Sequence, residues 1–162
     1  MKLLHTSPTK IEKIQSFYIH NEFQGALFFS QDLYFTTKQG FVYEIDIDES
    51  QIITAWDLEY NQDIIDEIKD RFNTYFDCNI DNDEAMDYLC EDLNIWESEE
   101  AQNNCEERAD FSWFMQGVQA KAAKLQGALC YQSEDEQGTV YIVNMINNEQ
   151  LLKDVTSREL EA

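Results

Sequence analysis

The sequence predicts a single α+β domain spanning residues 1–162. A length of 162 residues fits one domain. Hydrophobic residues make up 43% of the chain and aromatic residues 13%, which is enough to fill a core. Strand-like segments stand at the two ends of the chain, with helix-like segments between them. Such segregation of strands and helices along a sequence is typical of the α+β class.

The first strand is predicted over residues 2–5, an apolar run that ends before Pro8. Proline is favoured at the first position of a helix, because the N–H that it lacks would be unpaired there anyway. Ile11 and Ile14 follow with the spacing of a helix face. We therefore expect a short helix after Pro8.

Two further strands are predicted in the N-terminal part. Residues 25–30 are an apolar run led by glycine, which favours a buried strand, although a buried helix can give the same pattern. Residues 41–47 alternate, with apolar side chains on one face and the carboxylates Glu44 and Asp46 on the other. Alternation is typical of a half-buried strand, so both carboxylates are expected on its solvent face.

Three helices are predicted in the middle of the chain, because apolar residues recur there every three or four positions. They cover about 61–76, 84–91 and 110–125, the last with Asp110 as its N-cap and Gly127 as its stop. Strands return at 128–131 and 139–145, and the last ten residues predict a short strand or helix. The residues expected to face inward from the helices are Ile64, Ile65, Ile68, Phe72, Phe76, Ala85, Tyr88, Leu89, Phe111, Phe114, Val118, Ala122 and Leu125.

The net charge narrows the classes of partner. The chain has 33 Asp and Glu against 11 Lys and Arg, a formal net charge of −22. Direct nucleic-acid binding is not expected, because it requires a basic surface that displaces phosphate counterions. Residues 77–110 hold thirteen carboxylates and one cation, Arg108, which gives −12. Such a surface suits a basic protein partner, although a plain solvated surface explains it as well.

Several function classes lose support because their motifs are absent. The chain has no P-loop, GxGxxG, GxSxG or HExxH sequence, which disfavours nucleotide hydrolysis, Rossmann redox chemistry, serine hydrolysis and zinc proteolysis. Its four cysteines form no CxxC pair and it has two histidines, so reduced thiols and no metal site are expected. No apolar stretch is long enough to span a bilayer or to form a signal peptide core, so a cytoplasmic location is expected.

Two N-terminal segments are candidates for ligand binding. His5-Thr6-Ser7 stands at the end of the first strand, where its side chains can bond sugar hydroxyls or an amide. The alternative is a surface histidine beside a hydroxyl turn and helix cap. Phe28, Phe29 and Tyr34 place aromatic rings near Gly25, and such rings stack on a cationic heterocycle such as oxidised nicotinamide. The alternative is that the phenylalanines are core residues and Tyr34 an interface ring.

A third candidate is the acidic run Glu134-Asp135-Glu136, which precedes a glycine and a strand. A carboxylate at the lip of a strand can stabilise a developing oxocarbenium ion or accept a proton from a nucleophile. The alternative is a solvated acidic turn, which is common in proteins.

The order of several segments along the chain resembles that of a known family. Together the segments resemble a phage and mobile-element family of anti-CRISPR ADP-ribosyltransferases that act on the type I-F Cascade complex. The resemblance runs from Leu3 to Met145 and is weakest over 60–110. The segments that carry it are His5 to Pro8, Leu27 to Phe29 with Tyr34, Val42 to Ser50, Ala120 to Lys124, and Asp135 to Thr139 with Tyr141.

The resemblance implies an ADP-ribosyltransferase fold, in which two small sheets form a cleft for NAD and an acidic helical insertion covers about 61–110. It implies that His5 holds the nicotinamide ribose, with Thr6 and Ser7 extending that contact. The key acid would be Asp135, with Glu136 beside it as a helper or an alternative, since Glu134-x-Glu136 is similar to the ExE pattern of other transferases. The residues expected around the nicotinamide are Phe28, Phe29 and Tyr34.

The implied reaction cleaves the glycosidic bond of NAD and passes ADP-ribose to a protein. NAD is then a substrate, and no metal is expected. The target implied is an asparagine of the large, PAM-recognising Cascade subunit. Because a DNA-reading subunit is positively charged, we hypothesise that the acidic residues 77–110 form the docking face. Two alternatives remain open: a non-enzymatic acidic mimic of DNA, and a transferase toxin or anti-defence effector with another protein target.

Overall fold

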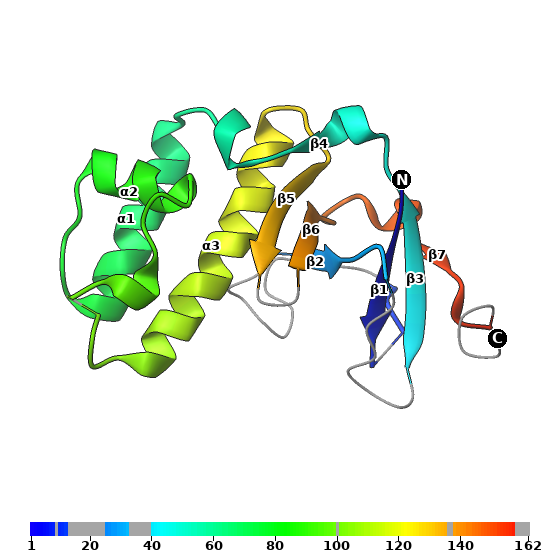
Figure 1. Cartoon of the computed structure of the whole chain (residues 1–162), viewed down its shortest axis with the longest axis horizontal. Helices are drawn as coiled ribbons and strands as arrows, with labels where there is room; N and C mark the ends of the chain where they lie inside the picture. The colour runs from blue at the N-terminus through cyan, green and yellow to red at the C-terminus, as the bar shows by residue number, and fades with distance from the viewer. Residues whose placement is uncertain (9, 13–24, 33–39, 100, 136–137, 158–162) are drawn as a thin grey trace.

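The computed structural model describes residues 1–8, 10–12, 25–32, 40–99, 101–135 and 138–157 (Figure 1). Within these ranges strands stand at both ends of the chain, with three α-helices between them, which confirms the α+β prediction. The elements are β1 (Lys2–Ser7), β2 (Ala26–Phe29), β3 (Phe41–Asp46), β4 (Ile52–Ile53), α1 (Gln62–Phe76), α2 (Asn82–Leu89), α3 (Cys105–Leu125), β5 (Cys130–Asp135), β6 (Gly138–Asn144) and β7 (Lys153–Asp154).

The strands form two sheets. The three-stranded sheet has the order β1-β3-β7 and is antiparallel. The four-stranded sheet has the order β2-β6-β5-β4, in which only the β4–β5 pair is parallel. A bridge between Leu4 and Ser30 links the sheets, with N–O distances of 2.8 and 3.0 Å. Figure 1 shows the four-stranded sheet between the helices and the three-stranded sheet.

The four-stranded sheet is buried on both of its faces. Tyr131 of β5 and Ile142 of β6 belong to a core cluster formed with the helices. Their neighbours Cys130 and Tyr141 belong to a second cluster, which includes Leu3 of the three-stranded sheet. Successive strand residues point to opposite faces, so one sheet supplies side chains to two separate cores.

The helices agree with the sequence prediction except at their ends and at one inward position. α2 covers Asn82–Leu89 rather than 84–91, because the chain leaves the helix at Cys90 and Glu91 has φ 63°. The expected inward residues of the helices are buried, apart from Leu125, which is 60% exposed in the last turn of α3. The prediction of Asp110 as an N-cap was wrong, because α3 begins at Cys105 with Asn104 at the N-cap position. The good helix formers that follow Cys105 extend the helix, and the acidic residues of its first turn suit the positive end of the helix dipole.

The N-terminal part required two corrections. Pro8 and residues 10–12 are not helical, and Ile14 lies outside the described residues. Instead, the Ile11 N–H donates to the hydroxyl of Tyr43 at 2.8 Å, which ties this segment to β3. Glu44 was expected to face solvent but is 7% exposed, since β3 is the central strand and has neighbours on both sides. Its carboxylate lies 4.0 Å from the Lys2 ammonium.

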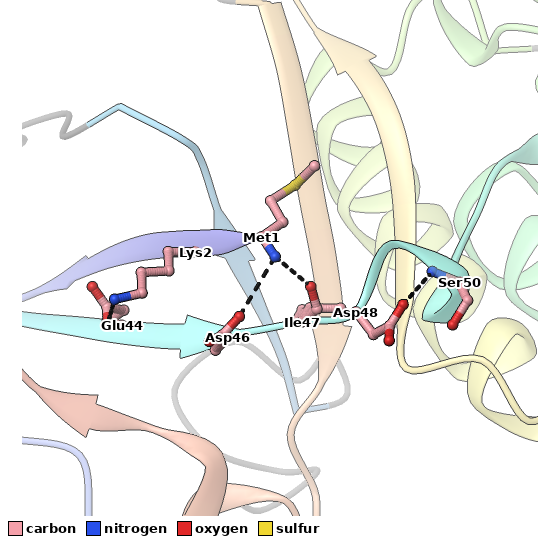
Figure 2. Close-up of polar contacts among 7 residues, drawn as sticks. All are labelled: Met1, Lys2, Glu44, Asp46, Ile47, Asp48 and Ser50. Atoms are coloured by element: carbon pink, nitrogen blue, oxygen red, sulfur yellow. Dashed lines mark hydrogen bonds and ion pairs between the residues drawn. The ribbon is translucent and has the colours of Figure 1, made fainter.

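Contacts between the first residues and the end of β3 fix the position of β1 (Figure 2). The Met1 ammonium donates to the Ile47 carbonyl at 2.7 Å and lies 3.5 Å from Asp46. The Ile47 N–H donates back to the Met1 carbonyl at 2.8 Å. Asp48 then accepts from the Ser50 N–H at 2.9 Å and starts a short 3₁₀ turn. The acidic, alternating segment after Phe41 therefore anchors the strand that carries His5.

The four cysteines lie in the described ranges and are free thiols. Cys130 is buried, and this burial raises its pKa to about 12, so it is a core residue rather than a nucleophile. No helix among the described residues is both long and apolar enough to cross a membrane.

Candidate active site

His5 lies on the inner face of β1, toward the four-stranded sheet. Leu3, two residues before it, is fully buried in the cluster between the sheets. Side chains two apart on a strand share a face, so His5 continues this inner surface. Its ring centroid is 5.5 Å from that of Phe29, which has an exposed fraction of 1%.

The hydrogen bond of His5 defines which ring nitrogen is free. Its Nδ1 lies 2.7 Å from the carbonyl oxygen of Phe28. A carbonyl only accepts, so Nδ1 carries the proton and donates. Burial lowers the pKa of His5, and the bond to the carbonyl offsets this only in part, so the ring is neutral near pH 7. A neutral ring protonated on Nδ1 leaves the Nε2 lone pair as an acceptor for a ligand hydroxyl.

The two phenylalanines support His5 in different ways. Phe28 contributes its backbone carbonyl, and its ring packs against the helical core cluster. Phe29 is almost fully buried between the sheets, beside the His5 ring. Their burial therefore favours the interpretation of both phenylalanines as core residues. Both contribute to the site by fixing the position of His5.

Thr6 and Ser7 lie on opposite faces of β1. Ser7 is 8% exposed and shares the inner face with His5, whereas alternation directs Thr6 to the other face. The structure thus brings Ser7, rather than Thr6, to the side of the sheet where the histidine lies.

A row of paired residues connects the histidine to the end of β5. Phe29 pairs with Tyr141 of β6, and Tyr141 pairs with Gln132 of β5. Each step between strands is about 4.8 Å. Glu134 stands two residues beyond Gln132, and its carboxylate accepts from the Thr139 hydroxyl at 2.8 Å. The acidic run therefore stands at the end of β5, whose first residue, Cys130, belongs to the same core cluster as Phe29, the neighbour of His5.

The position of Asp135 is defined by its backbone. It is the last residue of β5 and pairs with Gly138, the first residue of β6. Gly138 has φ 118°, which residues with a side chain rarely adopt, so the strand connection requires glycine there. The side chain of Asp135 lies outside what the structure describes, as do Glu136 and Tyr34.

Comparison with protein families decides how this arrangement is interpreted. A family model described as "Anti-CRISPR Type I-F ADP-ribosyltransferase AcrIF11" matches residues 1–151. The chain belongs to this family. A solved structure described as "Crystal structure of an anti-CRISPR protein" has 19% sequence identity and a TM-score of 0.49, with 88% of each chain covered. No curated protein matches the chain.

Membership in the AcrIF11 family establishes the activity. The protein is a mono-ADP-ribosyltransferase, its role is anti-CRISPR, and NAD is the substrate from which ADP-ribose is taken. The two sheets flanked by helices agree with an ADP-ribosyltransferase-like fold. Within the described residues, no group of three His, Cys, Asp or Glu side chains is arranged to hold a metal ion.

Two residues near the candidate site were not identified from the sequence. Tyr43 is 4% exposed and uses its hydroxyl to hold the segment after the histidine. Its inward position on an alternating strand was predicted, but its hydroxyl partner is a long-range contact with no sequence signal. Thr139 orients Glu134 from the neighbouring strand, and only the register of β5 and β6 reveals that pair.

Proposed function

We propose that this protein transfers ADP-ribose from NAD to an asparagine of the large, PAM-recognising subunit of type I-F Cascade, in a cleft between its two sheets. The observation that supports the NAD-cleaving activity is the neutral His5. Its Nδ1 donates to the Phe28 carbonyl, so its Nε2 remains to accept a hydrogen bond from the substrate. The description of the family as type I-F anti-CRISPR supports the target. The acidic helices between β4 and β5 are, in this proposal, an insertion over about 61–110 in one domain of 162 residues.

His5 would position the nicotinamide ribose. Its Nε2 accepts from a ribose hydroxyl, and its ring is kept in one orientation by Phe28 and Phe29. Ser7 extends the polar inner face of the strand, and Thr6 supports it from the other side. Tyr34 would stack on the nicotinamide. A substrate held in one orientation reacts faster because the entropy cost of alignment is already met.

Asp135 would supply the negative charge at the reacting carbon, with Glu136 as its helper. The bond between C1′ of the ribose and the nicotinamide nitrogen breaks, and its electron pair leaves with nicotinamide. Positive charge develops on the ribose ring, where a fixed carboxylate stabilises it. The amide nitrogen of the target asparagine then bonds to C1′ and gives up a proton, which a carboxylate accepts.

Modification of the PAM-recognising subunit would block DNA binding through charge as well as bulk. ADP-ribose carries two phosphates, and proteins that bind DNA rely on Lys and Arg to neutralise its phosphates. A bulky negative group beside these cations therefore opposes the duplex. The net charge of −12 over residues 77–110 supports a basic target, because opposite charge accelerates encounter.

The decisive experiment incubates the protein with labelled NAD and purified type I-F Cascade, with Asp135→Ala in parallel. Label on the large subunit with wild type and not with Asp135→Ala is the expected result. Mass spectrometry of the labelled subunit identifies the residue, and the proposal requires an asparagine. Glu136→Ala, measured in parallel, separates the roles of the two acids.

Two other outcomes would replace the proposal. Inhibition of DNA binding without NAD would make the chain an acidic mimic, for which the thirteen carboxylates of residues 77–110 are the relevant feature. Label on a protein other than Cascade, in cells that express the chain, would make it a transferase with a different target.

A further inference from the structure

A cavity lies between the four-stranded sheet and the helices, on the opposite side of that sheet from His5. Its volume is about 600 Å³, and its walls come from α2, α3, β5 and the turn that contains Trp96. Its lining includes the acidic residues Glu91 and Glu134 but no Lys, Arg or His. The role proposed above for the histidine, and for the acid at the end of β5, leaves this cavity unused.

Two side chains of β5 hold Glu91 in place. Its two carboxylate oxygens accept from the hydroxyls of Tyr131 and Ser133, at 2.6 and 2.7 Å. The residue has φ 63°, an uncommon conformation for a residue with a side chain, which turns the chain back over the strand after α2. Strained residues of this kind gather at functional sites. The carboxylate is therefore oriented before any ligand arrives.

Of the two acidic residues in the lining only Glu91 supplies its carboxylate to the cavity, because Glu134 alternates with Ser133 along β5 and its carboxylate bonds to the Thr139 hydroxyl. Glu91 has no ion-pair partner within the described residues. The ion pairs within the described residues involve Met1, Lys2 and Lys121, none of which reaches this cavity. The bonds to Glu91 come from hydroxyl groups, which orient a carboxylate without neutralising it. A carboxylate beside a partly closed cavity favours a cation there.

A buried amide provides a separate sign of a ligand. Gln119 of α3 is 3% exposed and lines the cavity. Its Nε2 donates to the Leu89 carbonyl at 2.9 Å, while its amide oxygen has no hydrogen-bond partner within the described residues. A buried acceptor without a partner costs about 1–3 kcal/mol. A donor on a bound ligand would remove this cost.

The remaining walls suit the stem of a long side chain. Phe111 and Met115 of α3 are buried and give the cavity an apolar side. Trp96 lines its rim with a ring that is 49% exposed, and Arg108 lies 6.0 Å from the centre of that ring. Arg108 itself is bonded to the Ala101 carbonyl at 2.6 Å, so it braces the ring from within the protein.

We propose that this cavity binds an arginine side chain of the target protein. A guanidinium is planar and carries five N–H donors, which match the two carboxylate oxygens of Glu91 and the amide oxygen of Gln119, and it stacks on aromatic rings. A lysine ammonium is compact and gives three donors from a single point, so it fits a spread set of acceptors less well. The arginine stem lies against Phe111 and Met115.

The position of the cavity links it to the proposed reaction, on which this inference rests. Ser133 and Glu134 line the cavity, and the next residue of β5 is Asp135. An arginine bound here places a neighbouring part of the target beside the end of the strand that carries the proposed acid. The helical insertion thus selects the substrate at the same strand whose end performs the chemistry.

The first test compares two charge-neutral variants of equal size. Glu91→Gln removes one charge from the cavity, and Glu99→Gln removes one exposed charge of the same acidic segment outside it. We expect Glu91→Gln to raise the KM for the target at least tenfold while target-free NAD hydrolysis is unchanged. Glu99→Gln should change that KM less than twofold. Equal effects of the two variants, or a normal KM for Glu91→Gln, would overturn the proposal.

The second test needs no transferase activity and so stands apart from the proposed function. The protein is titrated by NMR with Nα-acetyl-arginine amide and, separately, with its uncharged citrulline analogue. We expect the arginine compound to shift the Gln119 side-chain amide and the Trp96 indole, and expect Glu91→Gln to lose both shifts. Equal shifts with citrulline, or none with arginine, would refute the cavity as an arginine site. Shifts in a protein that fails to cleave NAD would retain the site and reject the reaction.

Discussion

On one face of the four-stranded sheet, Phe29 and Tyr141 lie in the core cluster beside the neutral His5. On the other face, the hydroxyls of Tyr131 and Ser133 hold the carboxylate of Glu91. The first face is shared with the three-stranded sheet and contains few charges. The second is covered by helices from a segment with a net charge of −12. The same strand β5 supplies both faces, because its residues alternate.

This difference separates two physical requirements. Cleavage of NAD needs fixed dipoles and one well-placed carboxylate in a site from which water is largely excluded. Attraction of a basic protein needs many exposed carboxylates, whose mutual repulsion would be costly inside such a site. The two proposals place these requirements on opposite faces of one sheet, an arrangement in which target recognition changes without altering the chemistry. It also predicts that substitutions on the His5 face change NAD cleavage, whereas substitutions on the helical face change binding of the target.

The largest expected effect comes from His5→Ala. Without the Nε2 acceptor the ribose is no longer held in one orientation, and we expect NAD cleavage to fall about 100-fold. Binding of the target should be unchanged, because the acidic helices are untouched. Single-turnover cleavage of labelled NAD measures the first quantity, and surface plasmon resonance with immobilised Cascade measures the second.

His5→Asn is the matched control for this variant. An asparagine amide can still donate to the Phe28 carbonyl but lacks the Nε2 acceptor. It should retain more thermal stability than His5→Ala and lose as much NAD cleavage. If His5→Asn cleaves NAD at the wild-type rate, the histidine acts only as a support for the fold.

The two halves of the molecule differ in how far they could be predicted from the sequence. The stripe from Ile64 to Phe76 was predicted correctly, because a helix face is defined by residues three and four apart. The solvent position of Glu44 was wrong, because its burial depends on β7, more than a hundred residues away. Local periodicity cannot indicate how many strands will flank a given strand.

The candidate sites show the same limit. The inward face of His5 follows from its distance of two residues from Leu3, so it could be inferred once the strand was recognised. The arginine cavity combines Glu91, Gln119 and Ser133, which come from three separate elements. None of them stands in a motif, and the signal that joins them is a set of long-range hydrogen bonds.

The second prediction contrasts two glycines, one near each half of the molecule. Gly138 starts β6 beside Asp135, and Gly127 ends α3 on the helical side; both have positive φ, 118° and 86°. A Cβ at either position meets no atom within 4 Å, so the cost of alanine is conformational. We expect each substitution to lower the free energy of unfolding by about 1–2 kcal/mol, measured by urea denaturation.

Their effects on activity should differ. Gly138→Ala should also slow NAD cleavage, because it distorts the connection next to the proposed acid, whereas Gly127→Ala should leave the cleavage rate of the folded protein unchanged. Similar cleavage rates for the two variants would mean that the β5–β6 connection does not position the acid.

The third prediction concerns ionic strength. Raising salt from 50 to 500 mM should slow modification of Cascade several-fold, because screening shortens the range of the attraction between an acidic and a basic protein. Hydrolysis of NAD without target should change little. Neutralising Asp83 and Glu84 together should reduce the salt dependence of modification and preserve NAD hydrolysis. Equal loss of both activities would show that these charges do not serve docking.

The smallest expected effect is a pH dependence of stability that arises from His5. Burial lowers its pKa from the ordinary value of 6.5, so the folded protein keeps the ring neutral where the unfolded chain binds a proton. The unfolded state then holds more protons between the lowered pKa and 6.5. Stability therefore rises with pH through this window, and it is lost as the pH falls below 6.5.

Thermal midpoints of wild type and His5→Asn, measured from pH 7.5 to pH 5, isolate this contribution. The 33 carboxylates are common to both proteins, so their titration cancels in the difference. Wild type should lose more of its midpoint on acidification than His5→Asn. Parallel curves would mean that the ring takes up a proton as readily in the folded protein as in the unfolded chain, so that burial does not keep His5 neutral.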